Sequence, residues 1–191
     1  MIKMNKPYLI LFLFVYSVQS IATAQPVPKG VSTKTRIYLV RHAEKASDGT
    51  NNPPLTIAGF KRAGDLARQL QHNAIQRIYV TQYQRTQLTA DSLQLLAAID
   101  TLHYLAEENG QELFLKMRQQ HDFGHRVLIV GHSDTVPDYL IKLGVANYSA
   151  DNIPATEFDN LFLVYYKRNF PLWGKWRAHL KKTKYGNPSI Q

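Results

Sequence analysis

Short apolar runs alternate with longer amphipathic stretches along most of this chain. The pattern predicts strands at about 36–40, 76–80, 99–105, 126–130 and 161–166, and helices at about 56–71, 85–97, 111–120 and 136–143. In the first helix, which Thr56 can cap, one face is expected to hold Ile57, Phe60, Ala63, Leu66, Ala67 and Leu70. Strands that alternate with helices favour a mostly parallel sheet covered on both faces.

The last part of the chain departs from this alternation. Only a short turn at 168–172 separates the strand at 161–166 from a further strand-like stretch at 173–182, so the two are expected to pair antiparallel. We therefore predict an α/β fold, a three-layer α/β/α sandwich with a mostly parallel central sheet and an antiparallel C-terminal edge.

The first 24 of the 191 residues have the layout of a cleaved secretory signal peptide. Lys3 and Lys6 precede an apolar stretch at 8–15, and a small-residue cleavage pattern ends at Ala24. The apolar stretch is shorter than the roughly 20 residues that span a bilayer. We expect an exported protein, periplasmic or secreted, with no stable membrane insertion after cleavage.

The remainder is expected to form one domain at 36–186, after a disordered leader at 25–35 and before a tail at 187–191. The chain has no cysteine, so its core alone must stabilise it. Loss of two lysines with the signal peptide changes the formal charge from +9 to +7. Such a surface attracts anions, but no nucleic-acid-binding module is recognisable and no nucleic-acid partner is expected.

Two histidines follow apolar strands directly. His42 comes after the strand at 36–40 with Arg41 beside it, and His132 comes after the strand at 126–130. Ligands bind at the carboxyl ends of the strands in open α/β sheets. A neutral imidazole is a competent nucleophile near neutral pH, so the pair indicates a site that handles an anion.

Arg85 is placed to complete such a site. It opens the helix at 85–97 just past a strand end, where the helix N-terminus favours anions and a guanidinium adds a bidentate clamp. The same position is unfavourable for a cation that has no anion to bind. Ser133 or Asp134 can serve as the N-cap of the helix that follows His132.

Four strings in this order resemble the histidine phosphatase superfamily, also called phosphoglycerate mutase-like. They are Arg41-His42-Ala43-Glu44, Leu55-Thr56-Ile57-Ala58-Gly59, Arg85-Thr86-Gln87-Leu88-Thr89-Ala90 and Gly131-His132-Ser133. The resemblance extends over about residues 36–145. Ala43 stands where the family usually has glycine, and Leu88 separates Gln87 from Thr89 in the string that the family writes Gln-Thr-Ala.

The resemblance implies a mechanism with neither metal nor cofactor. His42 attacks phosphorus and becomes phosphohistidine, while Arg41, Arg85 and His132 hold the phosphoryl oxygens. His42 is expected to be neutral and His132 charged. No metal site is expected at His121 and His125 either, because no third ligand is evident.

The family usually places a glutamate between the second arginine and the second histidine, as the acid that protonates the leaving oxygen. We expect Glu108 to fill this role. The alternatives are Glu107, Glu112, Asp134 and Glu44, or no acid at all.

The sequence thus predicts an exported, metal-independent phosphomonoester hydrolase of the histidine acid phosphatase type. Its substrate would be a small-molecule or exposed phosphomonoester. One alternative is a phosphoglycerate mutase-type phosphotransferase, although little chain is available for a lid between Arg85 and His132. The other is a non-catalytic module that binds phosphate or a phospho-sugar on the same fold.

Overall fold

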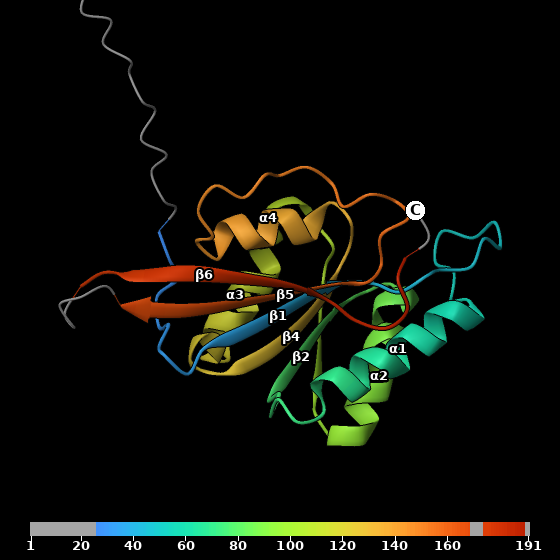
Figure 1. The fold of residues 1–191 in the computed structure, drawn as a ribbon, viewed down its shortest axis with the longest axis horizontal. Coiled ribbons are helices and arrows are strands. Elements are labelled where there is room, and N and C mark those ends of the chain that lie inside the picture. Colours follow the sequence, from blue (N-terminus) through green and yellow to red (C-terminus); the bar gives the residue numbers. More distant parts are fainter. Residues whose placement is uncertain (1–25, 169–173, 190–191) are drawn as a thin grey trace, which may run out of the picture.

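Within the described part of the chain, six strands form one sheet with helices on both of its faces (Figure 1). The computed structural model describes residues 26–168 and 174–189, apart from the side chain of Glu108. The predicted signal peptide and Trp173, the first residue of the expected last strand, lie outside these residues.

The sequence order of the elements follows the predicted alternation. The strands are β1 (Arg36–Arg41), β2 (Arg77–Thr81), β3 (Thr101–Tyr104), β4 (Arg126–Gly131), β5 (Asn160–Arg168) and β6 (Trp176–Lys184). The helices are α1 (Ile57–Leu70), α2 (Gln84–Ala97), α3 (Gln111–Gln119) and α4 (Thr135–Lys142), with 3-10 turns η1 (Glu108–Gly110) and η2 (Asp122–Gly124).

The strands lie in the order β3-β2-β4-β1-β5-β6. The pairs β3–β2, β2–β4 and β4–β1 are parallel, whereas β5 pairs antiparallel with both β1 and β6. The predicted fold class is therefore confirmed, including the antiparallel C-terminal edge. The carboxyl ends of β1, β2 and β4 lie at one edge of the sheet, which is where the candidate site forms.

A separate apolar core fills each face of the sheet. On one face α1 and α2 cover alternate residues of β1, β2 and β4, with Leu66, Leu70 and Leu93 buried beneath them. On the other face α3 and α4 contribute Leu113, Met117 and other buried side chains. Within the described ranges no helix has the length and apolar composition that crossing a bilayer requires.

The face that α1 buries differs from the predicted one. Ile57 and Phe60 are 91% and 51% exposed, and the buried face instead includes Gly59 and Arg62. At about 100° per residue, Ile57 lies nearly opposite Leu66 on the helix, so the two cannot share one face. The buried Arg62 is compensated by an ion pair with Glu44 (2.7 Å).

The segment before β1 packs more closely than a disordered leader would. Val31 is buried, and the buried hydroxyl of Thr35 donates to the carbonyl oxygen of Phe123 (2.7 Å). At the other end, the backbone N–H of Phe158 donates to the hydroxyl of Ser189 (2.8 Å). Residues 31–35 and part of the expected tail thus belong to the packed domain.

Candidate active site

A cavity of about 680 Å³ opens at the carboxyl ends of β1, β2 and β4, and we call it the histidine cavity. Its lining includes all four residues predicted to handle an anion, namely Arg41, His42, Arg85 and His132. The other lining residues are Lys45, Tyr83, Ala106, Glu107, Ser133, Asp134, Thr135, Asp138, Ala150 and Asn152. Residues far apart in the sequence meet here because parallel strands bring their carboxyl ends to one edge.

His42 is the first residue after β1, and its buried ring is fixed by the backbone. Its Nδ1–H donates to the carbonyl oxygen of Ala43 (2.8 Å), an atom that can only accept. Neutral His42 therefore carries its lone pair on Nε2, which has no partner among the described residues. The backbone N–H of His42 donates to the carbonyl oxygen of Gly131 (2.9 Å), which ties the end of β1 to the end of β4.

His132 lies with its ring centroid 5.3 Å from that of His42 and is held by hydroxyl groups. Its Nε2 is 3.1 Å from Oγ1 of Thr81, which is 2.9 Å from Oγ1 of Thr86. The Thr86 hydroxyl donates to the carbonyl oxygen of Tyr83 (2.8 Å), so Thr81 donates to Thr86 and accepts from His132. This relay fixes the proton of neutral His132 on Nε2 and leaves the lone pair on Nδ1.

The protonation states differ from the expected pair of one neutral and one charged histidine. Burial, together with His132, Arg41 and Arg85, lowers the pKa of His42 to about 3, although the hydrogen bond to Ala43 opposes this shift. Burial, Arg85 and Arg41 lower the pKa of His132 to about 4. Both rings are therefore neutral at neutral pH, because two cations and little water surround each of them.

Arg41 is buried and anchored on the segment before β5. Its Nη1 donates to the carbonyl oxygens of Pro154, Ala155 and Glu157 at 2.8–3.2 Å. Its Cζ lies 4.1 Å from the ring centroid of Phe158, and its Nε has no partner among the described residues. Nη1 thus fixes the position of the guanidinium, while its other N–H donors can bind a ligand.

Arg85 is held differently, since its guanidinium makes no hydrogen bond or ion pair within the described residues. Its Cζ lies 4.1 Å over the ring centroid of Tyr83, and its buried Nε is unpaired. Burial lowers the pKa of Arg85, although the group stays charged at neutral pH. A buried donor without a hydrogen bond destabilises the fold, and a bound anion would supply the missing hydrogen bond to this guanidinium.

The Leu-Thr-x-x-Gly string places α1 against the segment that follows His42. Thr56 caps the helix by accepting from the N–H of Gly59 (3.0 Å), and its own N–H donates to the carbonyl oxygen of Glu44 (2.9 Å). A Cβ at position 59 would collide with that same carbonyl oxygen. From α2, the Thr89 hydroxyl accepts a hydrogen bond from the N–H of Ala43 (2.9 Å). The motif at residues 85–90, which contains Leu88, therefore still contacts the segment that carries His42.

Of the candidate acids, some line the histidine cavity and others do not. Glu44 is engaged with Arg62, and Glu112 accepts from the N–H of Leu105 and pairs with Lys116, so neither lines the histidine cavity. Asp134 lines the cavity and caps α4 through Thr135 (2.8 Å), as predicted. Glu107 also lines the cavity.

Glu107 and the expected acid Glu108 are neighbours at the start of η1. One oxygen of Glu107, Oε1, accepts from the N–H of Glu112 (2.8 Å), while Oε2 has no partner among the described residues. Glu108 begins η1, and its side chain lies outside the described residues. Among the described side chains of this segment, Glu107 is the glutamate that lines the histidine cavity.

The cavity also contains residues that motif reading did not select. Lys45, Tyr83 and Asp138 line it, and Asp138 lies one helical turn beyond Asp134 on α4. The i, i+4 spacing of the two aspartates is a signal that could have indicated a shared face. Among the described residues no group of three or more His, Cys, Asp or Glu side chains could hold a metal ion.

A family model of the histidine phosphatase superfamily (branch 1) matches residues 37–113. No match was found among curated proteins. The solved structure of the protein histidine phosphatase SixA with tungstate is similar with a TM-score of 0.56 at 16% identity, covering 78% of this chain and 97% of that one.

Two further solved structures have the same fold. A candidate phosphohistidine phosphatase SixA from Agrobacterium tumefaciens has a TM-score of 0.53 at 20% identity, covering 80% of this chain and 99% of its own. A mycobacterial glucosyl-3-phosphoglycerate phosphatase in complex with VO3 has a TM-score of 0.53 at 14% identity, covering 77% and 97%. These solved structures share the fold of this chain, and the family model matches the stretch that contains three of the four motifs predicted from the sequence.

Proposed function

We propose that this protein is a phosphomonoesterase that works through a phosphohistidine on His42. The observation that carries the proposal is the state of His42. Its Nδ1 donates to the carbonyl oxygen of Ala43, while its Nε2 has no partner among the described residues and lies in a cavity beside two arginines. Solved structures with this fold hold tungstate or VO3, and the donors of Arg41 and Arg85 that have no partner among the described residues suit such oxyanions.

In the first step, Nε2 of His42 forms a bond to phosphorus and the bond from phosphorus to the leaving oxygen breaks. The leaving oxygen takes a proton from Glu107, which we assign in place of Glu108. Water then attacks phosphorus, Glu107 accepts a proton from it, and the N–P bond breaks to give inorganic phosphate. Arg41 and Arg85 stabilise the charge that spreads over the equatorial oxygens.

His132 fits a role that begins when the substrate binds. A phosphate monoester brings about −1.5 to −2 charges at neutral pH. This charge opposes the effect of Arg41 and Arg85 on His132, so its Nδ1 can take up a proton and donate to a phosphoryl oxygen. The charged His132 expected from the sequence would then be a property of the complex.

Metal independence and export are part of the proposal. Two guanidiniums offset the charge of the phosphoryl group, which is the task a metal ion has in other phosphatases. Export rests on the composition of residues 1–24 alone.

The test is turnover of an aryl phosphate by the full chain in the presence of a metal chelator. We expect activity that His42→Ala abolishes and that the matched change at an exposed histidine, His72→Ala, leaves intact. Acid-labile phosphate trapped on the wild-type protein, but not on His42→Ala, would identify the intermediate. Phosphate binding without turnover of any phosphomonoester would favour the non-catalytic module instead.

A further inference from the structure

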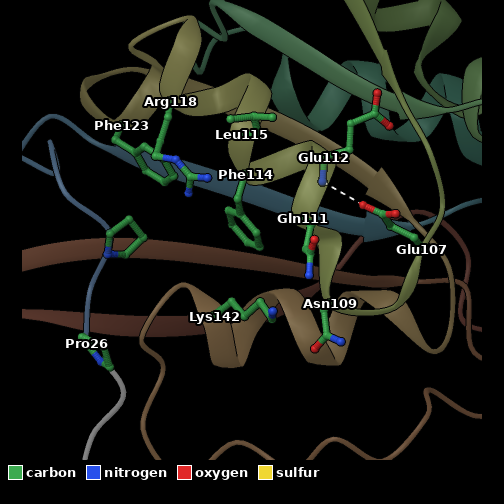
Figure 2. Close-up of a pocket in the computed structure, with 11 residues that line it drawn as sticks. Pro26, Glu107, Asn109, Gln111, Glu112, Phe114, Leu115, Arg118, Phe123 and Lys142 are labelled. Atoms are coloured by element: carbon green, nitrogen blue, oxygen red, sulfur yellow. Dashed lines mark hydrogen bonds between the residues drawn. The ribbon is translucent and has the colours of Figure 1, made fainter.

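A second cavity of about 640 Å³ adjoins the histidine cavity, and we call it the α3–α4 cavity (Figure 2). It is lined by Pro26, Pro28, Glu107, Asn109, Gln111, Glu112, Phe114, Leu115, Arg118, Phe123 and Lys142. Glu107 lines both cavities, so one ends where the other begins. On α4, Asp138 lines the histidine cavity and Lys142, one turn further along, lines the α3–α4 cavity.

The lining of the α3–α4 cavity combines an apolar surface with two cations, Arg118 and Lys142, and two carboxylates, of which Glu112 is paired with Lys116. Phe114, Leu115 and Phe123 supply the apolar surface, and Leu115 is 47% exposed. Figure 2 shows Arg118 beside Phe123, while Lys142 extends from α4. Neither cation has a hydrogen bond or ion pair with its side chain in the described part of the chain.

The direction of the proposed reaction connects the two cavities. In-line displacement puts the leaving oxygen on the side of phosphorus away from Nε2 of His42. If Glu107 protonates that oxygen, the leaving oxygen lies beside Glu107, and the rest of the leaving group must continue from there. The cavity on the far side of Glu107 offers apolar surface for it.

We infer that the α3–α4 cavity is the leaving-group subsite, and that the substrates are amphiphilic phosphomonoesters. Their leaving group has an apolar body, which lies on Phe114, Leu115 and Phe123, and an acidic group at its far end, which Arg118 and Lys142 attract. This inference rests on the proposed function and specifies the class of substrate for the same active site.

The first test compares leaving groups of increasing length on the full chain. Ethyl, butyl and hexyl phosphate are assayed below their micelle concentrations, with an aryl phosphate as the reference. We expect kcat/KM to rise about ten-fold to a hundred-fold from ethyl to hexyl phosphate, because each buried CH₂ stabilises the complex. Hexyl phosphate with a terminal carboxylate should gain about three-fold more, as an exposed charge pair would.

Substitutions test whether the preferences for long chains and for a terminal carboxylate arise in the α3–α4 cavity. Leu115→Asp should remove the rise in kcat/KM with chain length. The matched control is Leu96→Asp on α2, where the leucine is 65% exposed and lines neither cavity. Arg118→Ala should remove the gain from the carboxylate, whereas Arg177→Ala on β6 should leave it.

The outcomes separate this inference from the proposed function. Without turnover of the aryl phosphate, the proposed function fails and the subsite with it. Turnover with no dependence on chain length, or equal effects of Leu115→Asp and Leu96→Asp, would overturn the subsite and leave the phosphatase standing.

Discussion

The ends of β1 and β4 each present a histidine to the same cavity, yet they hold it by different means. At the end of β1 the ring of His42 is fixed by a backbone carbonyl, that of Ala43. At the end of β4 the ring of His132 is fixed by a hydroxyl from β2, that of Thr81, which is in turn held by Thr86. Both rings are neutral at neutral pH.

This difference matches the two proposed roles. A nucleophile must present the same lone pair in every cycle, and the carbonyl of Ala43 cannot rotate away or donate, so it enforces one tautomer of His42. A hydroxyl can turn and tolerates either neutral or charged His132, since Nε2–H donates to it in both states. The end of β1 is therefore fixed, whereas the end of β4 can change its protonation when an anion binds.

The largest expected effect is on kcat, and the two histidines should differ in the residual kcat and phosphoenzyme formation after each is replaced by alanine. His42→Ala should lower kcat by at least about 10⁴-fold and leave no phosphoenzyme, because the attacking atom is gone. His132→Ala should lower kcat by about 10²- to 10³-fold, the range for loss of one oxyanion donor, while phosphoenzyme still forms slowly. Rapid-quench trapping of labelled phosphate measures both. Trapped phosphate in His42→Ala would reverse the assignment.

A smaller effect is expected from the hydroxyl relay. Thr81→Val keeps the shape of the side chain but leaves Nε2–H of His132 without its acceptor, so kcat should fall about ten-fold and the free energy of unfolding by about 1–3 kcal/mol. Thr81→Ser restores the hydroxyl and should recover most of both. Because a stability defect alone would not alter the ring, the deciding readout is the nitrogen NMR spectrum of His132.

In that spectrum the wild-type protein should show His132 protonated on Nε2 at neutral pH. Thr81→Val should show a mixture of the two tautomers, since nothing then favours either nitrogen. A single unchanged tautomer in Thr81→Val would mean that the relay does not position the ring.

Much of this site could be predicted from sequence because its main residues lie directly after the ends of strands. His42 and His132 directly follow apolar strands and Arg85 opens a helix after a third, so a parallel sheet brings them together whatever the loops do. The cap at Thr56 was predictable for the same kind of reason, since it is a local hydrogen bond to Gly59.

The parts that failed depend on distant neighbours. The burial of Arg62 requires Glu44 from another segment. The charge of His132 depends on burial next to Arg41 and Arg85, which strand and helix periodicity cannot reveal. Metal independence, export and the roles of the site residues stay predictions.

The smallest expected effect is the pH dependence of stability. Both histidines have a folded pKa (about 3 and about 4) below the unfolded value near 6.5, so the unfolded chain binds more protons as the pH falls from 6.5 towards 4. Stability conferred by the neutral rings is present above pH 6.5 and is lost through this window, by about 1 kcal/mol per histidine between pH 6.5 and 5.5.

Sulfate binding can distinguish the protonation of His132 from that of His42. Sulfate stays a dianion from pH 7.5 to pH 5.5, so its own charge does not change over this range. Bound in the histidine cavity, it should raise the pKa of His132, so stabilisation by sulfate should grow by about 1 kcal/mol as the pH falls. His132→Asn should remove this growth, because the group that takes up the proton is gone, whereas His42→Asn should retain it. Denaturant unfolding at the two pH values measures the difference. Loss of the growth in His42→Asn alone would mean that the ring at the end of β1, and not that of β4, takes up the proton.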